Sequence, residues 1–357
     1  MERGYIVNTL KMMKMKEKKF LLAITWILCL CLSKKVIAQD VHFSQFYQNP
    51  ILCNPALTGI FNEEYKVGVT YREQWTTLAN PFRTSVVDME TKVHLNNVND
   101  YVSFGLLGYF DKAGSINYNT NGIYPAINYN KSIEDKYNSY ISVGFTAGYV
   151  TKSVDISKMT FDNQYINGAF NPLAGTGENI NNNKLAYWDL GAGVTFNSSI
   201  NEENTMNYFV GVAAYHISTP KNSFYGSDQL ANLSMRWDGT FGINYDFDYQ
   251  FGGVFYGNIM LQAPYQEIIA GGLFKWTKPD HSNSPAFTLF MGAFVRYQDS
   301  FIPTIKMRYK KSTFAFSYDA TTSSLKPDIN SHGAYEISIF TSGNWGNFDD
   351  KHLCPRF

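Results

Sequence analysis

The sequence has no surplus of charge, few cysteines and no stretch that could form a membrane-spanning helix. Its 30 lysine and arginine residues balance 30 aspartate and glutamate residues over 357 positions. Nucleic acids and other polyelectrolytes select domains with a surplus of one charge, so no nucleic-acid partner is predicted. The apolar run from Phe20 to Leu32 is shorter than the ~20 residues that a spanning helix needs, and no later run supplies one.

Cysteine is scarce: the chain has four, and Cys29 and Cys31 precede the signal cleavage expected below. The other two, Cys53 and Cys354, could form a bridge in an oxidising periplasm or stay free and buried. Neither has histidine or cysteine neighbours at the spacing of metal ligands, so no metal or other cofactor is predicted.

Catalytic signatures are also missing. The sequence contains no G-x-S-x-G elbow, Walker loop, H-E-x-x-H pair or dinucleotide fingerprint. The glycine-rich pieces Gly191-Ala192-Gly193 and Gly271-Gly272 lie inside strand patterns, which favours close packing at barrel bends over phosphate binding. A non-enzymatic protein is therefore predicted.

Residues 1–38 have the pattern of a Sec signal peptide. Five lysines between Lys11 and Lys19 precede the apolar run, and Val36-Ile37-Ala38 offers small or apolar residues for cleavage. We expect cleavage between Ala38 and Gln39, with Met13 and Met15 as alternative translation starts.

Aromatic side chains, in contrast, are abundant. The chain has 25 Tyr, 27 Phe and 6 Trp, which together make 16% of its residues. Aromatic girdles at both membrane interfaces give outer-membrane barrels this composition. A secreted β-sandwich or propeller is the alternative that composition leaves open.

A period of two runs along most of the chain. In the first example Tyr65, Val67, Val69 and Tyr71 alternate with polar or small residues, which predicts a strand with one apolar face. The strands run ~10 to 14 residues, close to the span of a tilted transmembrane strand. Fourteen are predicted, over residues 65–75, 82–94, 101–110, 118–131, 139–151, 185–198, 205–218, 233–247, 250–261, 267–276, 286–298, 301–310, 313–322 and 334–340.

Short and long separators alternate between these strands, the longest being 152–184 and 219–229. Long loops at one rim and tight turns at the other are typical of an outer-membrane barrel. An even number of strands also closes the sheet without leaving unpaired edges. The predicted fold is all-β, an antiparallel transmembrane β-barrel over residues 63–341, followed by a periplasmic tail at 342–357.

Residues 39–62 precede the barrel and do not follow a strand pattern. Pro50 and Pro55, each after an asparagine, and Gly59 deny this segment a regular ladder. It nevertheless carries apolar side chains such as Phe43 and Ile51, which are costly to leave in water. We predict a plug inside the barrel or a cover at its periplasmic mouth, with a disordered leader as the alternative.

Charged residues also fall on the polar faces of the strands. Lys66 and Arg72 are expected near Asp88, Glu90 and Lys92, and Arg236 shares a strand with Asp238. Lys306, Arg308 and Lys310 are expected opposite Glu336. These charges fit either a mutually neutralised interior or a selective pore.

Four pieces of sequence resemble one family. FSQFYQNP, the following NPALTG, a strand that ends in Y-R-x-Q-W and the ending CPRF are similar to the PorP/SprF family of outer-membrane proteins that accompany the type IX secretion system. Cys53 departs from the pattern, and no role is assigned to it. The matching positions are Phe43, Gln45, Tyr47, Asn49, Pro50, Asn54, Pro55, Ala56, Leu57, Thr58, Gly59, Tyr71, Arg72, Gln74, Trp75, Cys354, Pro355, Arg356 and Phe357.

The resemblance implies a place in the cell outer membrane, in contact with its lipid. It also implies help in exporting or attaching client proteins such as gliding adhesins, and contact with periplasmic secretion-motor components. By this analogy the loops 152–184 and 219–229 would meet the client, and residues 40–59 and the tail would face periplasmic partners. A passive porin or nutrient channel is the second hypothesis, and an outer-membrane enzyme is a weaker third.

Overall fold

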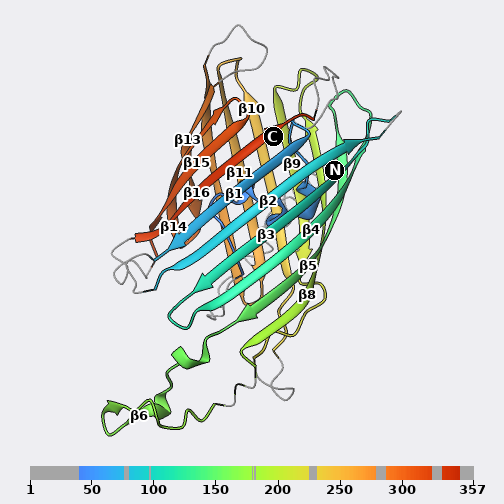
Figure 1. The fold of residues 1–357 in the computed structure, drawn as a ribbon. Coiled ribbons are helices and arrows are strands. Elements are labelled where there is room, and N and C mark those ends of the chain that lie inside the picture. Colours follow the sequence, from blue (N-terminus) through green and yellow to red (C-terminus); the bar gives the residue numbers. More distant parts are fainter. Residues whose placement is uncertain are drawn as a thin grey trace, which may run out of the picture. The chain divides into compact units, whose positions relative to one another are not determined.

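In the computed structural model, the described residues are 40–75, 80–95, 98–178, 180, 182–224, 231–278, 287–323 and 332–345. They form a closed antiparallel barrel (Figure 1). The predicted signal peptide, its cleavage site at Ala38 and Gln39, and tail residues 346–357 lie outside the described residues. Position 286, where one strand is predicted to begin, also lies outside the described residues. The same holds for the end of the loop predicted at 219–229.

Each barrel strand pairs with its neighbours in chain order, and β1 closes the ring against β16 in a register from Tyr65↔Gly343 to Gln74↔Ala334. The predicted all-β antiparallel barrel is confirmed. The barrel strands are β1 (Tyr65–Gln74), β2 (Phe82–His94), β3 (Tyr101–Ala113), β4 (Tyr118–Ser132), β5 (Tyr140–Ser153), β8 (Lys184–Ser199), β9 (Met206–Tyr215), β10 (Arg236–Asp246), β11 (Phe251–Gln262), β12 (Tyr265–Thr277), β13 (Phe287–Arg296), β14 (Ser300–Tyr309), β15 (Ser312–Thr321) and β16 (His332–Gly343).

The alternation in the sequence separates an outer face from a lumen. On β5, Ile141, Val143 and Phe145 are exposed on the outside, whereas Ser142 and Thr146 are buried inside. Closure satisfies the backbone groups of every strand from its two neighbours, which is what a hydrocarbon environment requires. The outer face is therefore an apolar surface suited to lipid.

The two rims of the barrel differ. β1 begins and β16 ends at one rim, here called the terminal rim, which also carries the turns at 95–100, 133–139, 200–205 and 310–311. The opposite loop rim carries the long connections 154–183 and 216–235, but also a two-residue turn at 263–264. Long loops are thus confined to a part of this rim.

The connection 154–183 contains elements that alternation did not predict. They are η3 (Ile156–Lys158), η4 (Asp162–Gln164) and a separate hairpin of β6 (Tyr165–Ile166) and β7 (Ala169–Phe170). Figure 1 shows this region beyond the loop rim. Strands of two residues carry too few side chains to show a period.

Some strand ends differ from prediction. β9 stops at Tyr215 and β10 starts at Arg236, which face each other as a register pair, whereas the alternation continues to Ser218 and back to Leu233. His216 has a positive φ of 55° and turns the chain away. A strand ends where the neighbouring strand stops pairing with it. The sequence of one strand does not show where its neighbour stops.

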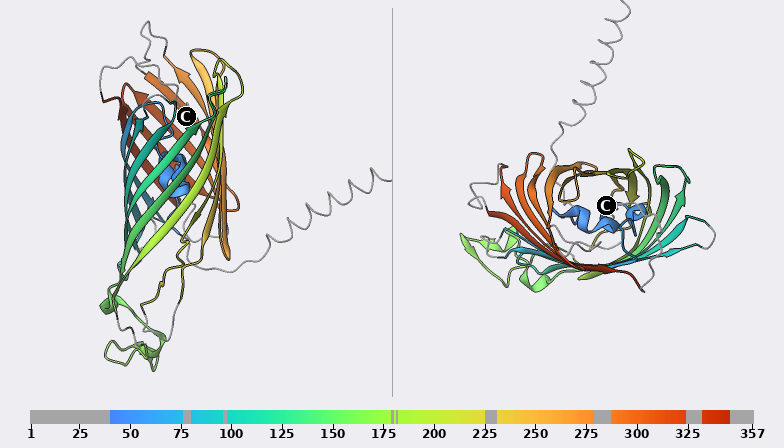
Figure 2. Two further views of the ribbon diagram at one scale, coloured as in Figure 1. Left: turned by 90° about the vertical axis from the view of Figure 1, so that its right-hand side faces the viewer. Right: turned by 90° about the horizontal axis from the view of Figure 1, so that it is seen from above.

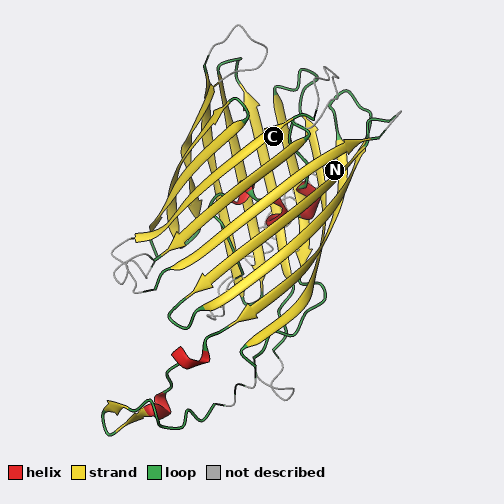
Figure 3. Cartoon of the chain, viewed as in Figure 1, coloured by secondary structure: helices red, strands yellow, loops and turns green. Residues whose placement is uncertain are grey.

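The segment before β1 lies inside the barrel (Figures 2 and 3). It contains η1 (Phe46–Gln48), α2 (Pro50–Cys53) and η2 (Pro55–Leu57), with both prolines at the first helical position, where no backbone donor is needed. No helix in the described part of the chain is long and apolar enough to cross a membrane. Residues 40–61, which we call the plug, lie in the lumen and bury side chains such as Phe43 and Ile51 (Figure 2).

Candidate functional site

Glycines on the inner wall make room for the plug. A Cβ atom added to Gly144 on β5 would lie 2.3 Å from the carbonyl carbon of Pro55, and one on Gly193 of β8 would lie 2.0 Å from Oδ1 of Asn54. Gly193, predicted to serve packing at a bend, therefore accommodates the plug instead. At these two glycines the backbone of the wall therefore lies directly against the NPALTG motif.

Amide side chains hold the centre of the plug. Asn54 uses its own Oδ1 to accept from the Ala56 amide at 2.9 Å, and its Nδ2 donates to Oγ1 of Thr195 at 3.2 Å. From the wall, Nδ2 of Asn128 donates to the carbonyl oxygens of Ala56 at 2.9 Å and Thr58 at 2.8 Å. These bonds replace the ladder that the prolines prevent, because buried backbone groups need partners.

A cluster of buried charges lies where β1, β15 and β16 meet. Arg72 Nη2 lies 3.0 Å from Asp319 Oδ2, and its Nη1 contacts Glu336 Oε1. Arg296 on β13 approaches the same Asp319 oxygen at 2.9 Å and Glu267 on β12 at 3.3 Å. All five side chains are almost fully buried, so each charge depends on its partners.

The plug supplies hydrogen bonds to this cluster. The backbone amides of Ser44 and Gln45 donate to the two carboxylate oxygens of Glu336 at 2.6 and 2.8 Å. The Ser44 hydroxyl donates to Asp319 at 2.7 Å and accepts from Arg72 at 3.0 Å. The plug therefore supplies hydrogen bonds to the buried charges of the wall.

A second cluster fixes the beginning of the described chain. Arg236 lies 2.8 Å from Asp238 and also contacts Asp40, and His216 lies 3.1 Å from Asp40 and 3.0 Å from Asp189. Burial raises the pKa of Asp40, but the Arg236 charge, the His216 ring and the Val41 amide together outweigh burial and hold that pKa well below its usual range. Asp40 is thus an anion locked between two cationic partners.

A third cluster lies on the other side of the plug. Lys66 Nζ lies 2.8 Å from Glu90 and 3.4 Å from Asp88, as predicted, and donates to the Gln48 carbonyl at 3.1 Å. Glu90 also accepts from the Gly59 amide at 2.7 Å. The plug is fastened to the wall at both of its ends and in its middle.

Two predicted charge pairings are wrong. Arg72 faces β15 and β16 rather than Asp88, because its register partner on β2 is Thr84. Lys306 lies opposite Ala315 and Phe290, not opposite Glu336, because β15 separates β14 from β16. Arg308 shares that strand, and Lys310 lies in the turn after it.

Most of the family positions meet in the plug. Of the strand motif, Arg72 reaches the plug, whereas Tyr71 faces outward to bond Glu73, and Gln74 and Trp75 end β1 at the loop rim. Cys354, Pro355, Arg356 and Phe357 lie outside the described residues. The plug positions are Phe43, Gln45, Tyr47, Asn49, Pro50, Asn54, Pro55, Ala56, Leu57, Thr58 and Gly59.

Cys53 is free and buried in the plug. Burial raises the pKa of its thiol, which keeps it protonated and unreactive. The possible bridge to Cys354 involves a residue outside the described part. Among the described residues, no group of three or more histidine, cysteine and acidic side chains is placed to hold a metal ion.

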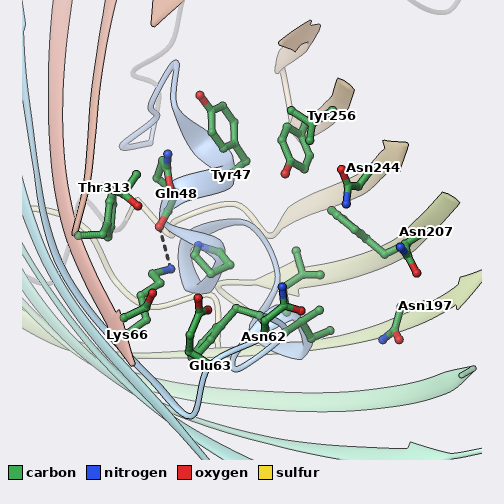
Figure 4. Close-up of a pocket in the computed structure, with 18 of the residues that line it drawn as sticks. Tyr47, Gln48, Asn62, Glu63, Lys66, Asn197, Asn207, Asn244, Tyr256 and Thr313 are labelled. Carbon is green, nitrogen blue, oxygen red and sulfur yellow. Dashed lines mark hydrogen bonds between the residues drawn. The ribbon is translucent and has the colours of Figure 1, made fainter. Parts of the chain in front are cut away.

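Between the plug and the terminal rim lies a cavity of about 820 Å³, which we call the chamber. The plug side is formed by residues such as Tyr47 and Gln48, and the wall side by residues such as Asn197, Asn207 and Asn244 (Figure 4). Tyr47 stacks on Tyr256 with ring centroids 4.8 Å apart, which fixes the aromatic edge of the chamber.

Sequence reasoning missed several residues that hold the plug. Asp319, Arg296 and Glu267 lie on inward positions of their strands, so the alternation could have placed them in the lumen. Asn128 and Asp189 also occupy inward positions, but no local pattern shows that a plug lies opposite them. Asp40 precedes the barrel and gave no signal.

The fold and the site define an outer-membrane β-barrel whose lumen is occupied by a segment of its own chain. A family model described as "Type IX secretion system membrane protein PorP/SprF" matches residues 36–340. The chain belongs to this family, and its location is the outer membrane. No curated protein matches it in sequence.

Solved outer-membrane barrels resemble the chain at low sequence identity. The chain resembles the TodX deltaS2S3 mutant monoaromatic hydrocarbon channel at 9% identity and a TM-score of 0.49, covering 83% of this chain and 94% of that one. A Pseudomonas aeruginosa FadL homologue matches at 8% identity and a TM-score of 0.48, over 81% and 92%. The NanC porin matches at 9% identity and a TM-score of 0.38, over 78% and 98%.

Proposed function

We propose that this barrel helps the type IX secretion system to export client proteins or hold them at the cell surface, without catalysing a reaction. The observation that carries the proposal is the plug. Buried charges and amides from many strands hold it in the lumen, which suits a scaffold for protein partners better than a path for diffusing solutes.

The connection 154–183 is the proposed contact with the client. Its hairpin region exposes apolar side chains, with Leu173 93% exposed and Tyr165 65% exposed. Ile166 on β6 and Phe170 on β7 are exposed as well. Exposed apolar side chains that gather in this way mark protein interaction sites.

The test removes these side chains without shortening the loop. A variant with Tyr165, Phe170 and Leu173 changed to Ser is expected to reach the outer membrane and fail to retain surface adhesins. Retention is measured by surface labelling of whole cells and by the adhesin released into the medium. A matched control changes Ile200 to Ser in a turn of the terminal rim. Normal retention by the loop variant would contradict the proposal.

The alternative is a passive porin or nutrient channel, for which the charged lumen is the supporting observation. Planar bilayers distinguish the two. The purified wild-type barrel is expected to give no single-channel openings and no swelling of liposomes in small sugars. Steady openings would favour the channel.

A further inference from the structure

Several buried polar atoms that line the chamber have no hydrogen-bond partner among the described residues. Asn197, fully buried, leaves both its amide oxygen and its amide nitrogen unpaired. Thr240 Oγ1, Gln48 Nε2 and the Tyr47 hydroxyl are also unpaired. Buried polar groups are normally satisfied, so these atoms need a polar partner, which is either water or a ligand.

The chamber also holds cations without acidic partners. Lys306 and Arg308 line it from β14, and no carboxylate of the described residues lies within 4.0 Å of either. Lys306 Nζ instead lies 4.7 Å from the centre of the Phe290 ring. By contrast, Lys66 and Lys275, which line the same chamber, are each paired with a carboxylate. The lining also includes the Glu63 carboxylate, and Lys306 and Arg308 remain without an ion pair among the described residues.

The position of the chamber limits how a ligand enters. Asn138 and Asn204, from turns of the terminal rim, and Ser342 near the end of β16 belong to its lining, so it lies at that rim. Its volume of about 820 Å³ lies within the range of ~300 to 1,000 Å³ typical of ligand sites. The plug lies across its other side.

The chain leaves the terminal rim away from the chamber. Trp345 packs its ring against Tyr65 with centroids 4.7 Å apart, and its Nε1 donates to Thr91 at 3.2 Å. Tyr65 belongs to the outward face of β1, so Trp345 follows the outside of the barrel. Trp345, the last residue that the structure describes, therefore does not line the chamber.

We propose that the chamber binds an acidic peptide segment of a periplasmic partner protein. The carboxylates of the peptide pair with Lys306 and Arg308, while its backbone donates to and accepts from Asn197. The Phe290 ring and the stacked tyrosines contact its apolar side chains. The inference deepens the proposed function, on which it rests for the periplasmic orientation of the terminal rim.

The test uses the full-length barrel, purified in detergent and immobilised. Three pools of octapeptides are passed over it. Each pool is random except for its two central residues, which are Glu in the first pool, Gln in the second and Lys in the third. The Glu pool is expected to be retained at least tenfold more than the Lys pool. The double variant Lys306→Gln, Arg308→Gln is expected to remove this preference, and Asn197→Ala is expected to weaken retention of all pools.

Lys131→Gln is the matched control, because Lys131 lies near the same rim but outside the chamber and is expected to keep the preference. Heat-modifiable migration on gels verifies that each variant is folded. Equal retention of the three pools, or a preference unchanged in the double variant, would overturn the inference. So would a preference that appears only after truncation at Trp345, since the tail would then be the occupant. These readouts are independent of adhesin retention, so either proposal can fail alone.

Discussion

Gly144 on β5 lies against the backbone of Pro55, and a Cβ atom there would come within 2.3 Å of the Pro55 carbonyl carbon and 2.4 Å of the Ala56 nitrogen. The neighbouring atoms belong to backbone and cannot rotate away. The family motif NPALTG and the wall glycine are therefore two halves of one contact.

Gly144→Val is expected to displace the plug and to lower the free energy of unfolding by about 1–3 kcal/mol, the usual cost of overpacking. Thermal unfolding in detergent, followed by heat-modifiable migration, measures the change. Gly108→Ala is the control, because a Cβ atom there meets no atom closer than 4.0 Å. A Gly144→Val barrel as stable as the control would refute this account of the motif.

Arg72→Ala is expected to be the most damaging single change in the lumen. It leaves the buried carboxylates of Asp319 and Glu336 without this partner, and breaking a buried pair costs about 3–5 kcal/mol. Urea unfolding measures the loss. Arg83→Ala removes an arginine that is itself 55% exposed from its pair with Glu73, and it is expected to change little. Similar midpoints for the two variants would contradict the prediction.

Cys53 offers a direct report on plug position. In a Cys354→Ser background, maleimide is expected to leave the folded barrel unlabelled, because the thiol is buried and protonated. Denaturation in urea should restore full labelling. Ile200→Cys in the same background, at an exposed turn, is the positive control. Rapid labelling of Cys53 in the native protein would show that the plug leaves the lumen.

Plug attachment is expected to depend on pH through His216, which follows the end of β9. Burial lowers the pKa of His216, but the hydrogen bonds to Asp189 and Asp40 and the charges of these two carboxylates together outweigh burial and raise the pKa from 6.5 to about 9. A raised pKa stabilises the folded state below about pH 6.5, and this contribution is lost as the pH rises through about 9.

Unfolding midpoints between pH 6 and 10 test this dependence. The wild-type midpoint is expected to fall across that window, and a His216→Gln variant is expected to show a smaller fall. Parallel pH profiles for the two proteins would show that His216 does not contribute.

The period of two predicted two-faced strands, and their length, their even number and the alternation of short and long separators favoured the barrel over a sandwich. The plug was predictable for a different reason: apolar residues such as Phe43 and Ile51 need burial, yet Pro50 and Pro55 prevent a strand. Both predictions depend only on the types of residues that lie near one another in the sequence.

Partners across the lumen could not be predicted in the same way. Arg72 pairs with Asp319 and Glu336, which lie more than two hundred residues later, and only closure of the ring brings them together. The glycines show the same limit, because an inward Gly193 has no local sign that Asn54 will fill its space. A sequence pattern identifies the face of a residue but not what lies opposite.

The cluster around Ser44 has a consequence for the order of assembly. β1 and β16 are the ends of the sheet and join when the barrel closes, and Ser44 contacts Arg72 on one and Glu336 on the other. The closing seam lacks part of its hydrogen bonding until residues 44 and 45 have entered. A barrel closed around an empty lumen would leave Glu336 without the Ser44 and Gln45 amides and Arg72 without the Ser44 hydroxyl.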